Sequence, residues 1–178
     1  AGIVVGTKEL IRGVFEAKSR FGGAADPHMC YLLERGIRTL HARMPIHASN
    51  SSELARRLEK HPSIISVNHP ILSSFADHEV AKKIVPKGTG MLSFSVKGGD
   101  NCALRFLRAL DIIFEATSLG GIESLVSCPF NTSHSFVPEE VRHEAGILPG
   151  FVRMSVGIEN VEDLWNDLDQ ALNSSQSG

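Results

Sequence analysis

Residues 151–159 read Phe-Val-Arg-Met-Ser-Val-Gly-Ile-Glu, and this stretch decides the fold class. Val152, Met154 and Val156 alternate with other residues, which is typical of a strand that buries one face. Arg153 is then expected on the opposite face, where a guanidinium can bind a carboxylate through two parallel hydrogen bonds. From spacing alone, a solvated strand arginine or a structural salt bridge remains the alternative.

Other helix and strand patterns surround this strand. Asn160 can cap a helix whose apolar residues recur at helical spacing, and Asp100 can cap an earlier one. Short strands are predicted at 64–67, 92–96 and 112–114, with helices between them. This order favours an α/β chain of the α+β type, with an open sheet and helices packed on one face.

The first part of the chain predicts mainly helices. Residues 3–5 are apolar without alternation and stop at a glycine, as at the end of a buried strand. Asp26-Pro27 is a helix-start signal. Pro45 is expected to end or kink that helix, because proline lacks a backbone donor and clashes with the preceding turn. A new helix is predicted over 52–60.

Composition bounds the class of protein. The chain has 178 residues, 42% of them hydrophobic, and a net charge of −2, so it can form one good core or one domain and a piece of another. Basic and acidic residues are balanced, which argues against nucleic acid or an anionic membrane as partner. We expect a cytoplasmic protein, or one of an organelle matrix if a transit peptide is missing.

Cysteine and histidine patterns suggest neither disulfides nor a metal site. The three cysteines are an odd number and lie far apart, which fits reduced thiols. The eight histidines include no pair at the i, i+4 spacing that places two imidazoles on one helical face, and Cys-x-x-Cys is absent. No metal ligand is therefore predicted.

Three stretches, in order, resemble the C-terminal signature of one enzyme family: 118–125, 138–142 with its continuation to Ile147, and 152–164. Upstream, residues 32–40 resemble the family's linker helix, and 90–94 resemble a strand of its small domain. The chain thus resembles the C-terminal portion of the cystathionine γ-synthase, cystathionine lyase and methionine γ-lyase family. These enzymes of cysteine and methionine metabolism depend on pyridoxal 5′-phosphate.

The resemblance implies an aspartate-aminotransferase-like fold, in which a large domain carries the cofactor and a small C-terminal domain closes over the substrate. Residues 1–45 would be the tail of the large domain and the linker helix, 46–172 the small domain, and 173–178 a disordered tail. The activity implied is that of a carbon–sulfur lyase or transsulfuration enzyme acting on a sulfur amino acid. Family members are typically homotetramers built from active dimers, so a homo-oligomer or the N-terminal part of the same enzyme is the expected partner.

The resemblance also implies a substrate site. Arg153 matches the arginine that holds the substrate α-carboxylate, and Ser118, with its neighbour Leu119, matches a serine at the same carboxylate. Ser133 matches a hydroxyl residue of the pocket. Thr117 stands where γ-synthases and γ-lyases usually carry a glutamate that meets the distal amino group of cystathionine. A neutral hydroxyl cannot form that ion pair, which favours a β-lyase or another thioether substrate.

No lysine of this sequence has the Ser-x-x-Lys context of the family's Schiff-base lysine, which the resemblance places upstream of Ala1. No catalytic residue is therefore expected in this chain, and by itself it should be inactive. Two interpretations remain open: a fragment of a full enzyme, or a truncated and catalytically inactive paralogue that serves as an assembly partner of an active family member.

Overall fold

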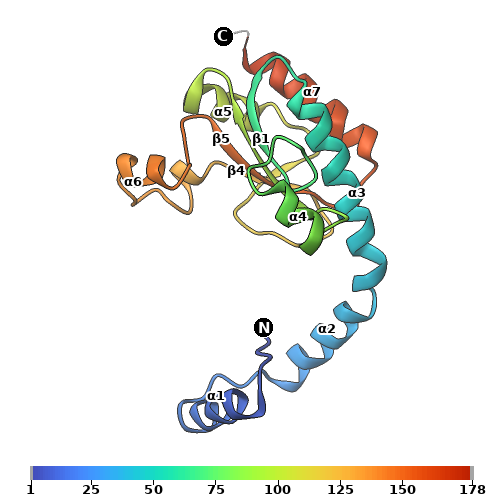
Figure 1. Ribbon diagram of the computed structural model, residues 1–178, viewed down its shortest axis with the longest axis vertical. Coiled ribbons are helices and arrows are strands. Elements are labelled where there is room, and N and C mark those ends of the chain that lie inside the picture. The colour runs from blue at the N-terminus through green and yellow to red at the C-terminus, as the bar shows by residue number, and fades with distance from the viewer. Residues whose placement is uncertain (1, 177–178) are drawn as a thin grey trace. The chain divides into compact units, whose positions relative to one another are not determined.

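The computed structural model describes residues 2–176 and divides into two compact units (Figure 1), one ending at Ala42 and the other beginning at Arg43. This division lies close to the boundary expected at residue 45. Within residues 2–176, no helix is both long and apolar enough to cross a bilayer.

The first unit contains two amphipathic helices, α1 (Lys8–Phe21) and α2 (Pro27–Arg38). The Asp26 carboxylate caps α2 by accepting from the backbone N–H groups of His28, at 2.9 Å, and Met29, at 3.0 Å, as the sequence predicts. The strand predicted at 3–5 is wrong, because these residues form no strand and are exposed. A single strand needs a partner to satisfy its backbone, and this unit offers none among the described residues.

Helix α3 (Leu40–Glu59) runs through Pro45 without ending there. The helix end predicted at Pro45 is therefore wrong, and the separate helix predicted over 52–60 is part of α3. The break falls at Thr39, between α2 and α3.

The second unit contains a five-stranded sheet with strand order β1-β2-β5-β4-β3. The pairs are antiparallel except for β3 with β4, which is parallel. The strands and the remaining helices are β1 (Ile64–Asn68), α4 (His78–Ile84), β2 (Met91–Val96), α5 (Gly99–Arg108), β3 (Phe114–Glu115), β4 (Leu125–Ser127), the 3-10 helix η1 (Pro129–Asn131), α6 (Glu139–Glu144), β5 (Phe151–Ser155) and α7 (Val161–Ser175).

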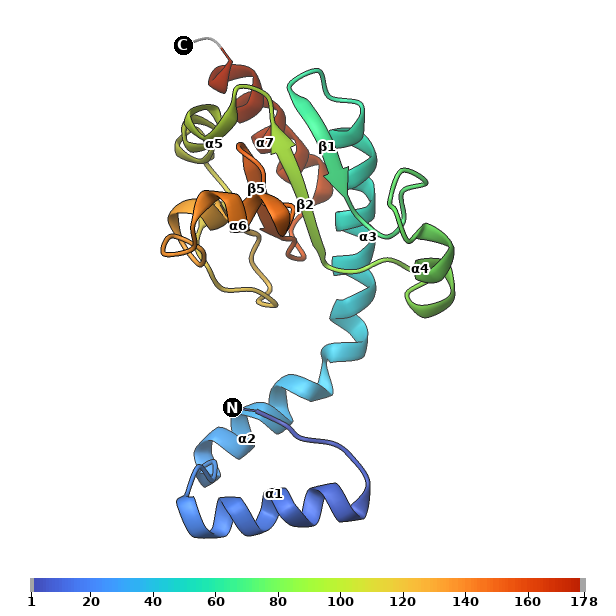
Figure 2. The same ribbon diagram turned by 60° about the vertical axis from the view of Figure 1, so that its left-hand side comes forward.

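The core lies between one face of the sheet and helices α3, α5 and α7, which Figure 2 shows together on that side. Phe94 and Met154 from the strands contact this layer, and Leu58, Phe106 and Leu168 come from the three helices, all fully buried. Burying each such side chain stabilises the fold by roughly 1.5–3 kcal/mol. The expected open sheet with helices on one face is confirmed. Polar residues, Arg153 among them, lie on the opposite face of the strands.

One helix cap agrees with the sequence pattern and two helix ends differ from it. Asn160 caps α7 as predicted, because its side chain accepts from the Glu162 N–H at 2.8 Å. Asp100 lies inside the first turn of α5 and accepts from Gly150 N–H at 2.7 Å, so it is not the cap. Helix α7 also continues to Ser175, within the stretch for which disorder is expected, because Arg105 binds the buried Ser175 carbonyl at 2.8 and 3.0 Å. Residues 177–178 lie outside the described residues.

Candidate substrate-binding site

A row of polar residues crosses the sheet on the face that carries Arg153. Asn68 of β1 pairs with Ser93 of β2, Ser93 pairs with Arg153 of β5, and Arg153 pairs with Ser127 of β4. Directly opposed residues of antiparallel strands project to the same face, so these four side chains share it. Arg153 therefore has a serine beside it on each neighbouring strand.

The Arg153 guanidinium is held by backbone carbonyls and has unused donor capacity. Its Nη2 donates to the carbonyl oxygens of Thr117, at 2.7 Å, and Ser118, at 3.0 Å. Its Nε is shielded from solvent and has no acceptor among residues 2–176. A buried donor without an acceptor is costly, and an ionised one more so. The arginine is thus fixed in position and suited to an anionic ligand such as a carboxylate.

The other predicted site residues lie at different distances from this arginine. Thr117 and Ser118 contact it through their carbonyls, while their side chains are exposed. Leu119 follows them and is also exposed. The Ser133 hydroxyl lies 2.8 Å from His134 Nδ1, and no hydrogen bond joins it to Arg153 in the part of the chain that the structure describes.

Sequence reasoning missed Ser93 and Ser127 as neighbours of Arg153, and Asn68 as the next residue of the row. The alternation of Ser93 with Leu92 and Phe94 does indicate a polar face in β2. It does not show which residue of β5 that serine faces, because register depends on how the strands pair. The strand β4 is only three residues long, too short for its alternation to be recognised.

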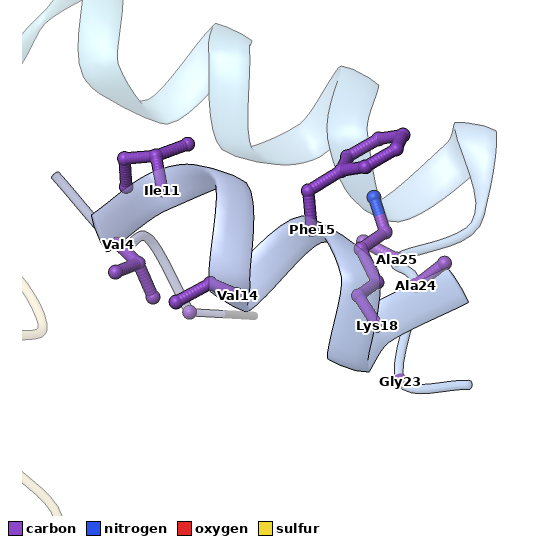
Figure 3. Close-up of a pocket in the computed structure, with 9 residues that line it drawn as sticks. Val4, Ile11, Val14, Phe15, Lys18, Gly23, Ala24 and Ala25 are labelled. Atoms are coloured by element: carbon purple, nitrogen blue, oxygen red, sulfur yellow. The ribbon is translucent and has the colours of Figure 1, made fainter. Parts of the chain in front are cut away.

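Lysine side chains are the residues that could attach a carbonyl cofactor. All seven are exposed. Lys18 borders a hollow of the first unit (Figure 3), but the other residues there are glycines, alanines and apolar side chains: Gly2, Val4, Ile11, Val14, Phe15, Gly23, Ala24 and Ala25. They include no hydroxyl or guanidinium group to bind a phosphate. This hollow therefore does not fit a phosphate-bearing cofactor.

No group of three histidine, cysteine, aspartate or glutamate side chains within residues 2–176 is placed to hold a metal ion. Two cysteines, Cys102 and Cys128, are buried, and Cys30 is exposed; all three are free thiols. Burial raises the pKa of Cys128 to about 12, so this thiol stays protonated and is a poor nucleophile.

Comparison with known proteins identifies the family to which this chain belongs. Residues 1–173 match the family model of the Cys/Met metabolism PLP-dependent enzymes. The chain belongs to this family. The L-methionine gamma-lyase of Pseudomonas putida is 39% identical over 177 residues, which cover 98% of this chain and 44% of that protein. The cystathionine beta-lyase of Lactococcus lactis subsp. cremoris is 38% identical over 173 residues, covering 97% of this chain and 45% of that protein.

A solved member of the Cys/Met metabolism family has the same fold. The crystal structure of cystathionine gamma-lyase from Lactobacillus plantarum complexed with L-serine matches with a TM-score of 0.91 at 31% identity, covering 97% of this chain and 45% of that one. The resemblance inferred from the sequence motifs and its fold class are thereby confirmed, and pyridoxal phosphate is the cofactor of the family. The chain spans less than half the length of these relatives.

Proposed function

We propose that this chain is the substrate-closing C-terminal domain of a pyridoxal-phosphate-dependent carbon–sulfur lyase or transsulfuration enzyme, and that Arg153 binds the α-carboxylate of a sulfur amino acid. One observation carries this proposal: the guanidinium is fixed by two carbonyls, while its buried Nε lacks an acceptor among the described residues. Holding the carboxylate in one place orients the bonds at Cα, which is where the chemistry of this family occurs. When bound, the cofactor supplies an electron sink for charge that develops at Cα.

The domain assignment is part of the same proposal. Residues from 46 onward would form the small domain, and residues up to 45 would belong to the large domain and linker helix. Helices α1 and α2 bury none of their side chains, and Val5, Phe21 and Tyr31 expose 90%, 87% and 58% of their surface. Amphipathic helices of this kind need a partner surface. We propose that the partner is the cofactor-carrying part of the enzyme, in the oligomers typical of the family.

The residue at 117 bears on which reaction is catalysed. Thr117 carries no charge, so no carboxylate at this position meets a distal amino group of the substrate. Ser133 and Leu119 remain proposed pocket residues on the strength of the resemblance. A β-elimination or the cleavage of another thioether is the reaction that we favour, and cystathionine γ-cleavage or synthesis is the competing one.

The test uses the full-length enzyme loaded with cofactor and the variant Arg153→Ala. We expect KM for the amino-acid substrate to rise about 100-fold, since removing one partner of a desolvated charge pair costs roughly 2–5 kcal/mol. Cofactor content and its visible absorbance should stay the same. Arg12→Ala is the matched control, because Arg12 is an exposed arginine of α1 that pairs with Glu16 on the same helix. An unchanged KM would remove Arg153 from the site. Cleavage that requires an active family member in addition to this protein would favour an inactive assembly partner.

A further inference from the structure

The segment that follows Arg153 touches one loop at every second residue. Arg153, Ser155, Gly157 and Glu159, here called the clasp residues, alternate along β5 and its continuation. The loop between β3 and β4, residues 117–124, lies against all four. Arg153 binds the start of this loop through the carbonyls of residues 117 and 118.

The remaining clasp residues hold the rest of the loop. Ser155 Oγ accepts from the Gly120 N–H at 3.1 Å. The end of the loop is held by Glu159, because the Ser124 N–H and hydroxyl donate to its carboxylate at 2.6 and 2.9 Å. The Gly157 N–H in turn donates to the Ser124 hydroxyl at 2.8 Å. The loop is thus fixed at its start, middle and end by one short segment.

Gly157 shows how closely the loop and the clasp residues approach. A Cβ atom at this position would lie 2.3 Å from the Ile122 carbonyl oxygen and 2.7 Å from the Glu123 carbonyl carbon. Both are backbone atoms, so no side-chain rotation relieves the contact. The Ile158 N–H also donates to the Ile122 carbonyl at 2.9 Å. The loop therefore sits on the clasp segment without space for adjustment.

Helix α3 anchors the clasp segment to the core. The Asn50 side chain donates to the carbonyls of Gly157, at 3.2 Å, and Glu159, at 2.9 Å. His47 Nδ1 donates to the Val156 carbonyl at 2.7 Å. These two helix residues are buried. Glu159 therefore connects a rigid helix to a loop whose other end supplies the two acceptors of Arg153.

We infer that Glu159 is a positioning residue for substrate binding: by fixing Ser124 it holds the 117–124 loop, and through the loop carbonyls it holds the guanidinium that receives the substrate carboxylate. This inference rests on the proposed function of Arg153. Glu159 touches neither substrate nor cofactor in this scheme. Its carboxylate accepts two hydrogen bonds from Ser124, and hydrogen bonds to a carboxylate are about twice as strong as neutral ones. Its loss therefore leaves the end of the loop less firmly held.

The test compares two ligands without a sulfur leaving group, L-alanine and ethylamine, which differ only in the carboxylate. Their inhibition constants are measured with the full-length, cofactor-loaded enzyme. Glu159→Ala should weaken L-alanine binding about tenfold, because the guanidinium that receives the carboxylate is then less well held. Ethylamine binding should weaken by less than about twofold. Glu159→Gln should recover most of the affinity, because an amide oxygen still accepts from Ser124 N–H. Glu162→Ala is the control. Glu162 lies at the start of α7 and pairs with Arg57 of α3.

A merely structural role predicts a different result. Equal weakening of both ligands, or a lower active fraction with unchanged inhibition constants, would overturn the inference. In an Arg153→Ala background, Glu159→Ala should add less than about twofold, because the two residues act on one interaction; a full tenfold effect there would also overturn it. If Glu159→Ala does not fold, Ser155→Ala removes the contact to Gly120 and should show the same selectivity at roughly threefold, the loss of one neutral hydrogen bond.

The proposed function fails separately. If Arg153→Ala weakens L-alanine and ethylamine equally, the guanidinium does not bind the carboxylate, and the proposed function and this inference both fall. If Arg153→Ala discriminates between the two ligands and neither Glu159→Ala nor Ser155→Ala does, only the inference falls.

Discussion

The Asp167 carboxylate stabilises the turn that leads into β3, and its removal should be among the most damaging single changes in the second unit. Asp167 lies on α7 with 4% of its surface exposed. It accepts from three consecutive backbone N–H groups, those of Asp111 at 2.8 Å and of Ile112 and Ile113 at 2.9 Å each. Three donors on one anion lock the chain direction at this turn.

The loss in free energy of unfolding for Asp167→Ala follows from how deeply each of the three N–H donors is buried. The bonds from Asp111 and Ile112 are partly buried, and water can replace the carboxylate there, so each is worth about 1 kcal/mol. The Ile113 N–H is buried, and leaving it unpaired costs about 2 kcal/mol. The free energy of unfolding should therefore fall by about 4 kcal/mol, a large part of the 5–15 kcal/mol typical of a domain. Asp167→Asn should lose about 2 kcal/mol, because its one amide oxygen cannot serve both sides.

Urea unfolding followed by tryptophan fluorescence measures this loss. Trp165 is the single tryptophan of the chain and lies on the same helix. Asp163→Ala is the control: it removes an exposed carboxylate from the first turn of α7, worth about 0.3–1 kcal/mol through the helix dipole. A loss below 1 kcal/mol for Asp167→Ala, similar to that of the control, would refute the reasoning.

Two further changes test other contacts. Gly157→Ala places a methyl group against the Ile122 carbonyl and should lower the thermal unfolding midpoint by several degrees. Gly13→Ala is the control: its methyl group meets nothing within 4 Å, and it should stabilise α1 by about 0.5–1 kcal/mol. Equal effects of the two substitutions would contradict the packing argument. Burial lowers the pKa of His69 below its ordinary value of 6.5, although a hydrogen bond to Thr89 opposes the shift. The folded state therefore favours the neutral ring, and this stabilisation is complete above pH 6.5 and lost as pH falls below it. The difference in urea midpoint between pH 7.5 and 5.5 should be larger for the wild type than for His69→Gln, and identical differences would speak against this histidine.

Local patterns in the sequence were sufficient to predict the strands β1, β2 and β5 and the helix caps at Asp26 and Asn160. These features depend on residues close together in the chain, so alternation and capping signals report them. The motifs at 118–125 and 152–164 were sufficient for the family. Pro45 shows the limit of local rules, because the helix tolerates it and breaks at Thr39.

The tertiary structure alone decided which residues meet at the site. Arg153 and the Thr117 carbonyl are 36 positions apart, and Ser124 and Glu159 are 35 apart. No local periodicity can pair such residues, because their contact depends on the strand order β2-β5-β4 and on the register within it. The sequence determined that an arginine would face away from the core. Only folding determined that a loop before another strand would bind its Nη2 and that its Nε would be buried without an acceptor in the described part of the chain.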